Sequence, residues 1–180
     1  DMKGYELLKA TMFGFGYPNY GVALLLKEEA TGKIFLQRVK ITGSNAKPRI
    51  LEIFKDEVIG LPGIPTVSAL PLNGPEYMFF AVDKNVYCLD LNNITKPVTL
   101  YKSFDANVVA MNAESETYSC AHMAVGLENG EFYILMIYGA KNLSEEEKVI
   151  YPKHGAAYPA EERMGRIVDI KYKQLDHWNY

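Results

Sequence analysis

The sequence predicts an all-β protein built from antiparallel four-stranded repeats, in the manner of a β-propeller. Tyrosine (13) and phenylalanine (8) are abundant, and both favour strands. The hairpins of the pattern follow one another at intervals of roughly 45 to 55 residues, a spacing typical of propeller blades. The pattern itself, an apolar run, a polar turn and a second apolar run, occurs at 22–26/34–36, 78–82/86–89 and 122–127/132–136. An irregular β-sandwich is the alternative fold.

Strand-like runs flank each hairpin and complete three predicted blades. The runs before the hairpins are 11–15, 66–70 and 107–111. The runs after the hairpins are 50–54, 98–104 and 148–151. The predicted blades therefore span about 11–54, 66–104 and 107–151.

Two further segments, 4–9 and 165–172, are interpreted as terminal strands, each lacking the rest of its blade. Pairing of these two strands would close a fourth blade and leave no free sheet edge. A closing blade needs four strands, however, and the chain ends offer two or three. We therefore expect a partial propeller from a longer protein rather than a complete small one.

Composition and charge argue against a nucleic-acid-binding protein and against a membrane-spanning helix. The net charge is −3, from 19 basic and 22 acidic residues, and the charges are interspersed, so no nucleic-acid partner is expected. No apolar run approaches the ~18 residues that a membrane-spanning helix needs. Residues 1–5 do not have the pattern of a signal peptide, although a leader removed earlier is compatible with a chain that does not begin with Met.

The two cysteines, Cys88 and Cys120, each lie among apolar strand residues. Such cysteines usually behave as small buried hydrophobic side chains. We expect two buried thiols, with a disulfide between adjacent blades as the alternative.

Two segments resemble a known family. Residues 163–173 and 79–87 are similar to the carboxy-terminal region of the PKD-like family of lipoproteins from gut Bacteroidetes. In that family a lipidated amino terminus and immunoglobulin-like domains precede a propeller-like region. The resemblance implies an exported protein of the cell surface or periplasm, with a role in glycan or peptide uptake. No catalytic signature accompanies it.

The aromatic loop at 14–21 is the first candidate ligand site. Its glycines lack the third position of a dinucleotide-binding motif and the Gly-Lys-Ser/Thr of a P-loop, so we expect no nucleotide cofactor. Phe15, Tyr17 and Tyr20 are suited to stacking on a sugar or a peptide, while partly buried packing is the alternative. The second candidate is the long connection 153–163, which carries His154 and Tyr158.

Metal and hydrolytic sites are not favoured. The three histidines, His122, His154 and His177, include no pair at a metal-binding interval. Cys120 and His122 share a strand face by alternation, but no nucleophile elbow flanks them, which favours core packing. We expect no metal and no other cofactor.

The sequence therefore predicts a non-catalytic binding or scaffold module that contacts a glycan, a peptide or a partner protein. The alternative function is a glycan-active hydrolase or lyase with carboxylates at the propeller mouth. That alternative requires acids to converge, with carboxyl groups ~5 to 10 Å apart. The acids considered for it are Asp83, Asp105, Glu114 and Asp169.

Overall fold

The structure is a computed structural model that describes residues 3–14, 20–44, 47–71, 76–117 and 120–138. Within these residues the chain forms eleven strands and no helix. The strands make three antiparallel sheets, in which each strand pairs with its neighbours in the sequence. The prediction of an all-β protein with repeated antiparallel sheets is therefore confirmed.

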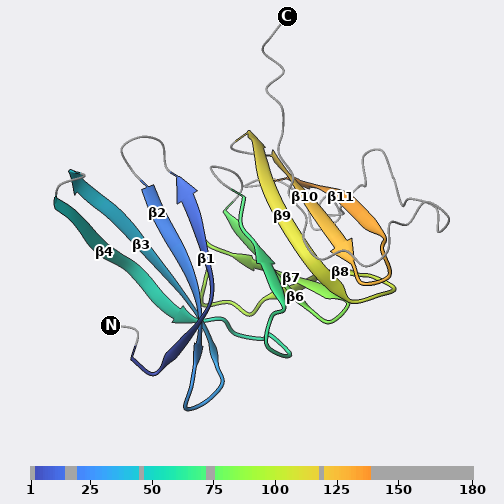
Figure 1. Ribbon diagram of the computed structural model, residues 1–180, viewed down its shortest axis with the longest axis horizontal. Coiled ribbons are helices and arrows are strands. Elements are labelled where there is room, and N and C mark those ends of the chain that lie inside the picture. The colour runs from blue at the N-terminus through green and yellow to red at the C-terminus, as the bar shows by residue number, and fades with distance from the viewer. Residues whose placement is uncertain (1–2, 15–19, 45–46, 72–75, 118–119, 139–180) are drawn as a thin grey trace, which may run out of the picture.

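We number the three sheets in chain order (Figure 1). The first sheet contains β1 (Tyr5–Gly14), β2 (Tyr20–Glu28), β3 (Ile34–Ser44) and β4 (Lys47–Glu57). The second sheet contains β5 (Val67–Ala69), β6 (Tyr77–Val82), β7 (Asn85–Asp90) and β8 (Thr99–Ser103). The third sheet contains β9 (Val108–Thr117), β10 (Cys120–Leu127) and β11 (Phe132–Tyr138).

The sheets follow the predicted repeats closely in the second unit. Its four strands fall within the predicted span 66–104. In the third unit the three described strands match the first three predicted ones. The predicted strands 148–151 and 165–172 lie outside the described residues.

The amino-terminal segment differs from the prediction. Residues 5–9 are not a separate terminal strand, because they continue into 10–14 as the single strand β1, which pairs with β2 along its length. The register shifts between Leu7 and Lys9, which makes Leu8 a bulge residue. A bulge resets the alternation of side chains, so one strand looks like two runs in the sequence.

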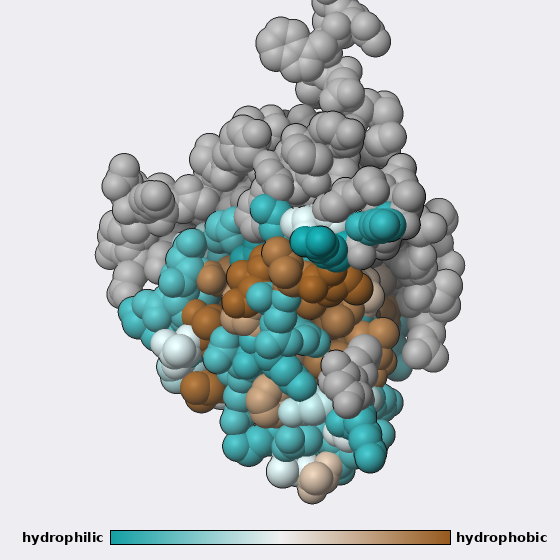
Figure 2. All heavy atoms as spheres, turned by 90° about the vertical axis from the view of Figure 1, so that its left-hand side faces the viewer, coloured by the Kyte–Doolittle hydropathy of each residue, from teal (hydrophilic) through white to brown (hydrophobic). Residues whose placement is uncertain are grey.

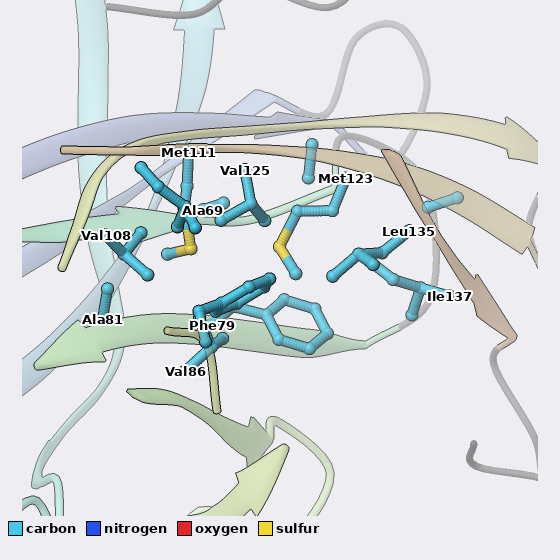
Figure 3. Packing of buried hydrophobic residues seen from close by; sticks show 14 residues of the cluster. Ala69, Phe79, Ala81, Val86, Val108, Met111, Met123, Val125, Leu135 and Ile137 are labelled. Carbon is cyan, nitrogen blue, oxygen red and sulfur yellow. The ribbon is translucent and has the colours of Figure 1, made fainter. Parts of the chain in front are cut away.

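The second sheet lies between the other two, and its strand β6 is buried on both faces. Met78 and Phe80 of β6 belong to one core cluster, with apolar residues of β2 and β3. Phe79 and Ala81, which alternate with them, belong to the other cluster, with residues of the third sheet. Figure 3 shows Phe79 among side chains of β9, β10 and β11. Burial of both faces explains why β6 is apolar without alternation.

Hydrogen bonds tie successive sheets together near their first strands. The Thr66 hydroxyl, just before β5, lies 3.3 Å from the carbonyl oxygen of Val108 in β9. Lys9 Nζ of β1 donates to the carbonyl oxygen of Ser68 in β5. The Val108 N–H also donates to the carbonyl of Asp83, in the β6–β7 turn (2.8 Å). The described strands thus form a stack of three sheets whose first strands are linked.

Candidate functional site

The predicted ligand residues fall largely beyond the part of the chain that the structure describes. Phe15, Tyr17, His154 and Tyr158 lie outside the described residues. Tyr20 is the first residue of β2, where its backbone stands opposite Gly14 and Ile41, but its side chain is not described. A ligand role for these five residues stays a prediction.

The acids considered for catalysis occupy different parts of the described structure. Asp83 is in the β6–β7 turn with a positive φ of 52°, a conformation that Asp tolerates better than most residues. Asp105 lies in the connection from β8 to β9, at the same end, since the Phe104 N–H donates to the Lys84 carbonyl (2.9 Å). Glu114 lies six residues along β9 from Val108, or about 20 Å away in an extended strand. Asp169 is outside the described residues.

The three described acids fall into two groups. Asp83 and Asp105 are both exposed turn or loop residues, and Glu114 is far along β9 from them. Among the described residues, no group of three or more His, Cys, Asp or Glu side chains is arranged to hold a metal ion.

The described part also contains no helix long and apolar enough to cross a membrane.

A small polar cluster lies between the first strands of the first two sheets. Lys9 donates to the Ser68 carbonyl, and Thr11 is two residues further along the same side of β1. Within the described residues, Thr11 Oγ1 and Ser68 Oγ are buried without a hydrogen-bond partner. Buried hydroxyls usually have a partner, so these atoms have spare capacity to bind water or a small polar ligand.

Arg38 provides a second polar link between the first two sheets. Its side chain faces the second sheet, and the residue is only 7% exposed. Its Nη1 atom lies 3.3 Å from Glu76 Oε2, and its guanidinium lies 5.8 Å from the centre of the Phe54 ring. The pair of opposite charges and the aromatic ring compensate the burial of the cation, which gives Arg38 a structural role.

Tyr101 of β8 is the described phenol most affected by its surroundings. Burial raises the pKa of its hydroxyl, and negative charge on Cys88 or Tyr77 would raise it further. Its ring lies 4.8 Å from that of Phe79. Cys88 carries a thiol that is half-buried against the same core cluster. A neutral, packed phenol of this kind contributes to the core rather than to proton transfer.

The first sheet presents an apolar surface on the side that faces away from the second sheet. We call this surface the outer face. Residues that stand opposite one another on paired strands have their side chains on the same face of the sheet. The strand register therefore identifies the residues of the outer face. Its apolar members are Leu7, Ala10, Met12, Val22, Leu24, Phe35, Val39, Ile41 and Ile50, and Leu26 lies on the same side of the sheet but is fully buried.

Several side chains of the outer face are open to solvent. Ile50 is 71% exposed, Met12 62% and Leu7 47%. Figure 2 shows apolar side chains gathered on the side of the molecule that carries the first sheet, with polar residues around them. Along β4 the face changes to polar residues, Glu52, Lys55 and Glu57. The outer face therefore has an apolar centre and a polar margin, the usual anatomy of an interaction surface.

An aromatic pair marks one end of the outer face. The rings of Tyr5 and Phe35 meet edge to face with centroids 5.6 Å apart. Lys55 Nζ lies 3.4 Å from the centre of the Tyr5 ring. Such an ammonium over a ring is a cation–π contact, which fixes the long side chain of Lys55 over the sheet.

Sequence reasoning missed the outer face, although the sequence contains its signal. In β2 the apolar residues occupy successive positions, Val22 to Leu26, so both faces of the strand are apolar. Only one of these faces can meet the second sheet.

The sequence matches no family model, and no curated protein is similar to it. The candidate surface is accordingly assigned from its geometry alone.

Proposed function

We propose that the chain is a non-catalytic binding or scaffold module of an exported cell-surface protein. The observation that carries this proposal is the outer face of the first sheet. Soluble monomers rarely expose large contiguous apolar patches, and those that do usually use them for interaction. A module of this kind requires a stable, well-packed β scaffold and an open surface, and the described residues provide both.

We also propose that the three sheets are successive blades of a propeller. Each sheet is a simple up-and-down meander, and the sheets pack face to face in chain order. The first strands are linked by the Thr66 and Lys9 hydrogen bonds, as expected where blades converge on an axis. The final strand of the third blade is expected after residue 138.

The separation of Glu114 from Asp83 and Asp105 supports the non-catalytic part of the proposal. A retaining or inverting glycosidase needs two carboxyl groups within ~10 Å of each other across the scissile bond. Glu114 is separated from Asp83 and Asp105 by the length of β9. A hydrolase that paired Glu114 with Asp83 or Asp105 would therefore have its two carboxyl groups too far apart.

For a ligand, we propose a glycan or a peptide that stacks on Phe15, Tyr17 and Tyr20, with His154 and Tyr158 as further contacts. The exported location rests on the resemblance of 79–87 and 163–173 to the lipoprotein family. Aromatic rings are suited to both ligand classes because each presents an apolar surface on which they stack.

The test is a binding and turnover experiment on one set of samples. The labelled chain is applied to arrays of glycans and peptides, and the same ligands are incubated with the chain and analysed by mass spectrometry. We expect saturable binding without new products. The variant Phe15→Ala/Tyr17→Ala/Tyr20→Ala should lose this binding while its circular dichroism spectrum stays unchanged. Product formation that Glu114→Gln abolishes would establish the hydrolase instead.

A further inference from the structure

The hairpin of β3 and β4 extends beyond the second sheet. Both strands contain 11 residues, whereas β6 and β7, the longest strands of the second sheet, contain 6. With ~3.3 Å per residue, this difference in length is about 16 Å. Figure 1 shows the end of the hairpin at the upper left, away from the second sheet. We call the paired residues 40–44 and 47–51 the hairpin tip.

The burial of the first sheet shows how far a neighbouring sheet reaches. On the side that faces the second sheet, Ala23 and Arg38 stand opposite one another and are 1% and 7% exposed. The next residue of β3 on this side, Lys40, is half-buried, and its partner Leu51 is 53% exposed. The second sheet therefore ends before the hairpin tip. A sheet of similar size on the outer face would leave the tip uncovered in the same way.

Large aliphatic side chains are exposed on both sides of β4. Ile50 lies on the outer face and is 71% exposed, whereas Leu51 lies on the opposite side. Ile53, at the bulge just beyond the tip, is 47% exposed. Because β4 is an edge strand, both of its sides and its edge are accessible. A flat protein surface covers one side of such a strand, whereas a fluid lipid interface can contact both.

The hairpin tip is basic, although the chain as a whole is acidic. Its charged residues are Lys40, Lys47 and Arg49, with no acid, whereas the net charge of the chain is −3. The register places these three bases on one side of the hairpin, opposite the side that carries Ile50. The ion pairs among the described residues include none of the three. Their charges are therefore available to an anionic partner.

We propose that the hairpin tip binds the surface of a membrane that contains anionic phospholipids. Ile50 and Leu51 enter the boundary between headgroups and acyl chains, and the three bases stay among the phosphates. Lys and Arg side chains are long enough to lie along an apolar surface while the charge remains in the polar layer. The strength of such binding increases with the buried apolar area and with the attraction to anionic lipids.

The aliphatic character of the tip favours lipid over an acidic polysaccharide. Sugars are recognised mainly by stacking on aromatic rings, and the exposed apolar residues of the tip are isoleucine and leucine. Figure 2 shows strongly hydrophilic residues next to apolar ones on this side of the molecule. The inference goes beyond the proposed glycan or peptide ligand and does not depend on it.

The experiment is co-sedimentation of the full chain with vesicles of phosphatidylcholine that contain increasing fractions of phosphatidylglycerol. We expect binding that increases with the anionic fraction and weakens at high salt, which screens the attraction between the bases and the lipid. Lys47→Glu/Arg49→Glu should weaken binding at least about tenfold, because each base near an anionic surface contributes to the affinity. Ile50→Ser/Leu51→Ser should also weaken it at least about tenfold, because less apolar area is buried.

Each double variant has a matched control. Lys84→Glu/Lys96→Glu changes the net charge by the same amount at two exposed lysines of the second sheet and its connections. Leu100→Ser/Ile64→Ser removes two aliphatic side chains that are 58% and 49% exposed but lie outside the tip. Both controls should bind vesicles like the wild-type chain. Circular dichroism reports whether each variant is folded, and the charge and aliphatic variants provide independent tests if one of them is not.

Three results would overturn the proposal: a wild-type chain that does not bind anionic vesicles, tip variants that bind like the wild-type chain, or controls that lose binding as strongly as the tip variants. Binding to heparin but not to vesicles, lost in Lys47→Glu/Arg49→Glu, would assign the tip to an acidic polysaccharide instead. None of these results decides the proposed function, which the glycan and peptide arrays test through Phe15, Tyr17 and Tyr20.

Discussion

At the scale of single residues, Tyr101 links burial to stability at high pH. Its pKa is raised in the folded chain, chiefly by burial, above the value of 10.0 that the phenol has when exposed. The folded state therefore retains the proton at a pH at which the unfolded state loses it. The contribution to the free energy of unfolding is complete below pH 10 and is lost as the pH rises through the raised pKa.

We predict that the free energy of unfolding of the wild-type chain falls as the pH rises above 10. Tyr101→Phe should reduce this fall, because the variant has no proton to release at that site. The measurement is urea denaturation at a series of pH values for both proteins. Some decline should persist in the variant, because burial also raises the pKa of Tyr77. Parallel declines in the two proteins would show that Tyr101 titrates normally.

Gly60 tolerates a side chain less well than Gly32, although both have a positive φ. Its φ is +84°, and a Cβ there would lie 3.1 Å from the Cβ of Pro97. Gly32 also has a positive φ, +72°, but a Cβ added there would have no atom within 4 Å. We predict a loss of about 1 kcal/mol for Gly32→Ala from backbone strain alone. Gly60→Ala should lose about 2 kcal/mol or more, because it adds the clash with Pro97.

Chemical denaturation of the two alanine variants compares these losses directly. The exposed Gly32 serves as the control for the strain that both positions share. Equal losses at Gly60 and Gly32 would mean that Pro97 moves away at little cost. In that case the connection from the first sheet to the second would be less tightly packed than its geometry indicates.

At the scale of elements, the sequence predicted the strands best in the second sheet, where both faces of the strand β6 are buried. The strands of the second sheet match their predicted runs because β6 is uniformly apolar and its turn, at Asp83, is short and polar. In β3 the prediction stopped at Leu36, although the strand continues to Ser44. The continuation contains Arg38, a buried cation whose partners, Glu76 and Phe54, are distant in sequence. Pairing of this kind cannot be read from local composition.

The alternating residues of β6 provide a test of the three-sheet stack. Phe79 and Phe80 are both fully buried, but they face different sheets. We predict that Phe79→Ala and Phe80→Ala each reduce the free energy of unfolding by about 3–5 kcal/mol, as for large aromatic residues in a core. Urea denaturation measures both, with the exposed Leu100→Ala as the control, for which a change within ~0.5 kcal/mol is expected.

The comparison of the two phenylalanines is informative because the stack requires both losses to be large. In a two-layer sandwich one face of β6 would meet solvent, and one of the substitutions would cost little. A loss below ~1 kcal/mol in the free energy of unfolding for Phe80→Ala would therefore show that the first sheet does not pack against the second. The same result for Phe79→Ala would show that the third sheet does not pack against the second.

At the scale of the whole molecule, the candidate surface was less predictable than the fold. Apolar composition indicates that a strand face is buried, but it does not say what covers the face. Leu24 and Leu25 are adjacent leucines in β2, and only the arrangement of sheets assigns one to the core and the other to the outer face. The predicted ligand residues, such as Tyr17, depend on loop conformation, which sequence patterns specify weakly.

The last prediction concerns how the three sheets unfold. The second sheet contributes to both core clusters, so damage to it should weaken the packing of the first and third sheets together. We predict that Phe79→Ala accelerates native-state hydrogen exchange in β2 and β3 as well as in β10, although Phe79 packs only on the third-sheet side. Mass spectrometry of proteolytic fragments measures this exchange, with Leu100→Ala as the control.

The reasoning depends on cooperativity rather than on direct contact. If the stack opens as one unit, the slowest amides in all three sheets exchange through the same global opening, and a destabilised β6 speeds them equally. If the sheets open separately, Phe79→Ala speeds exchange only in the second and third sheets and leaves β2 and β3 unchanged. That outcome would mean that the first sheet unfolds independently of the other two, and that the cluster containing Phe80, Leu25 and Leu36 is the boundary between the two unfolding units. It would also make the first sheet, with its outer face, a unit whose stability depends on what packs against that face.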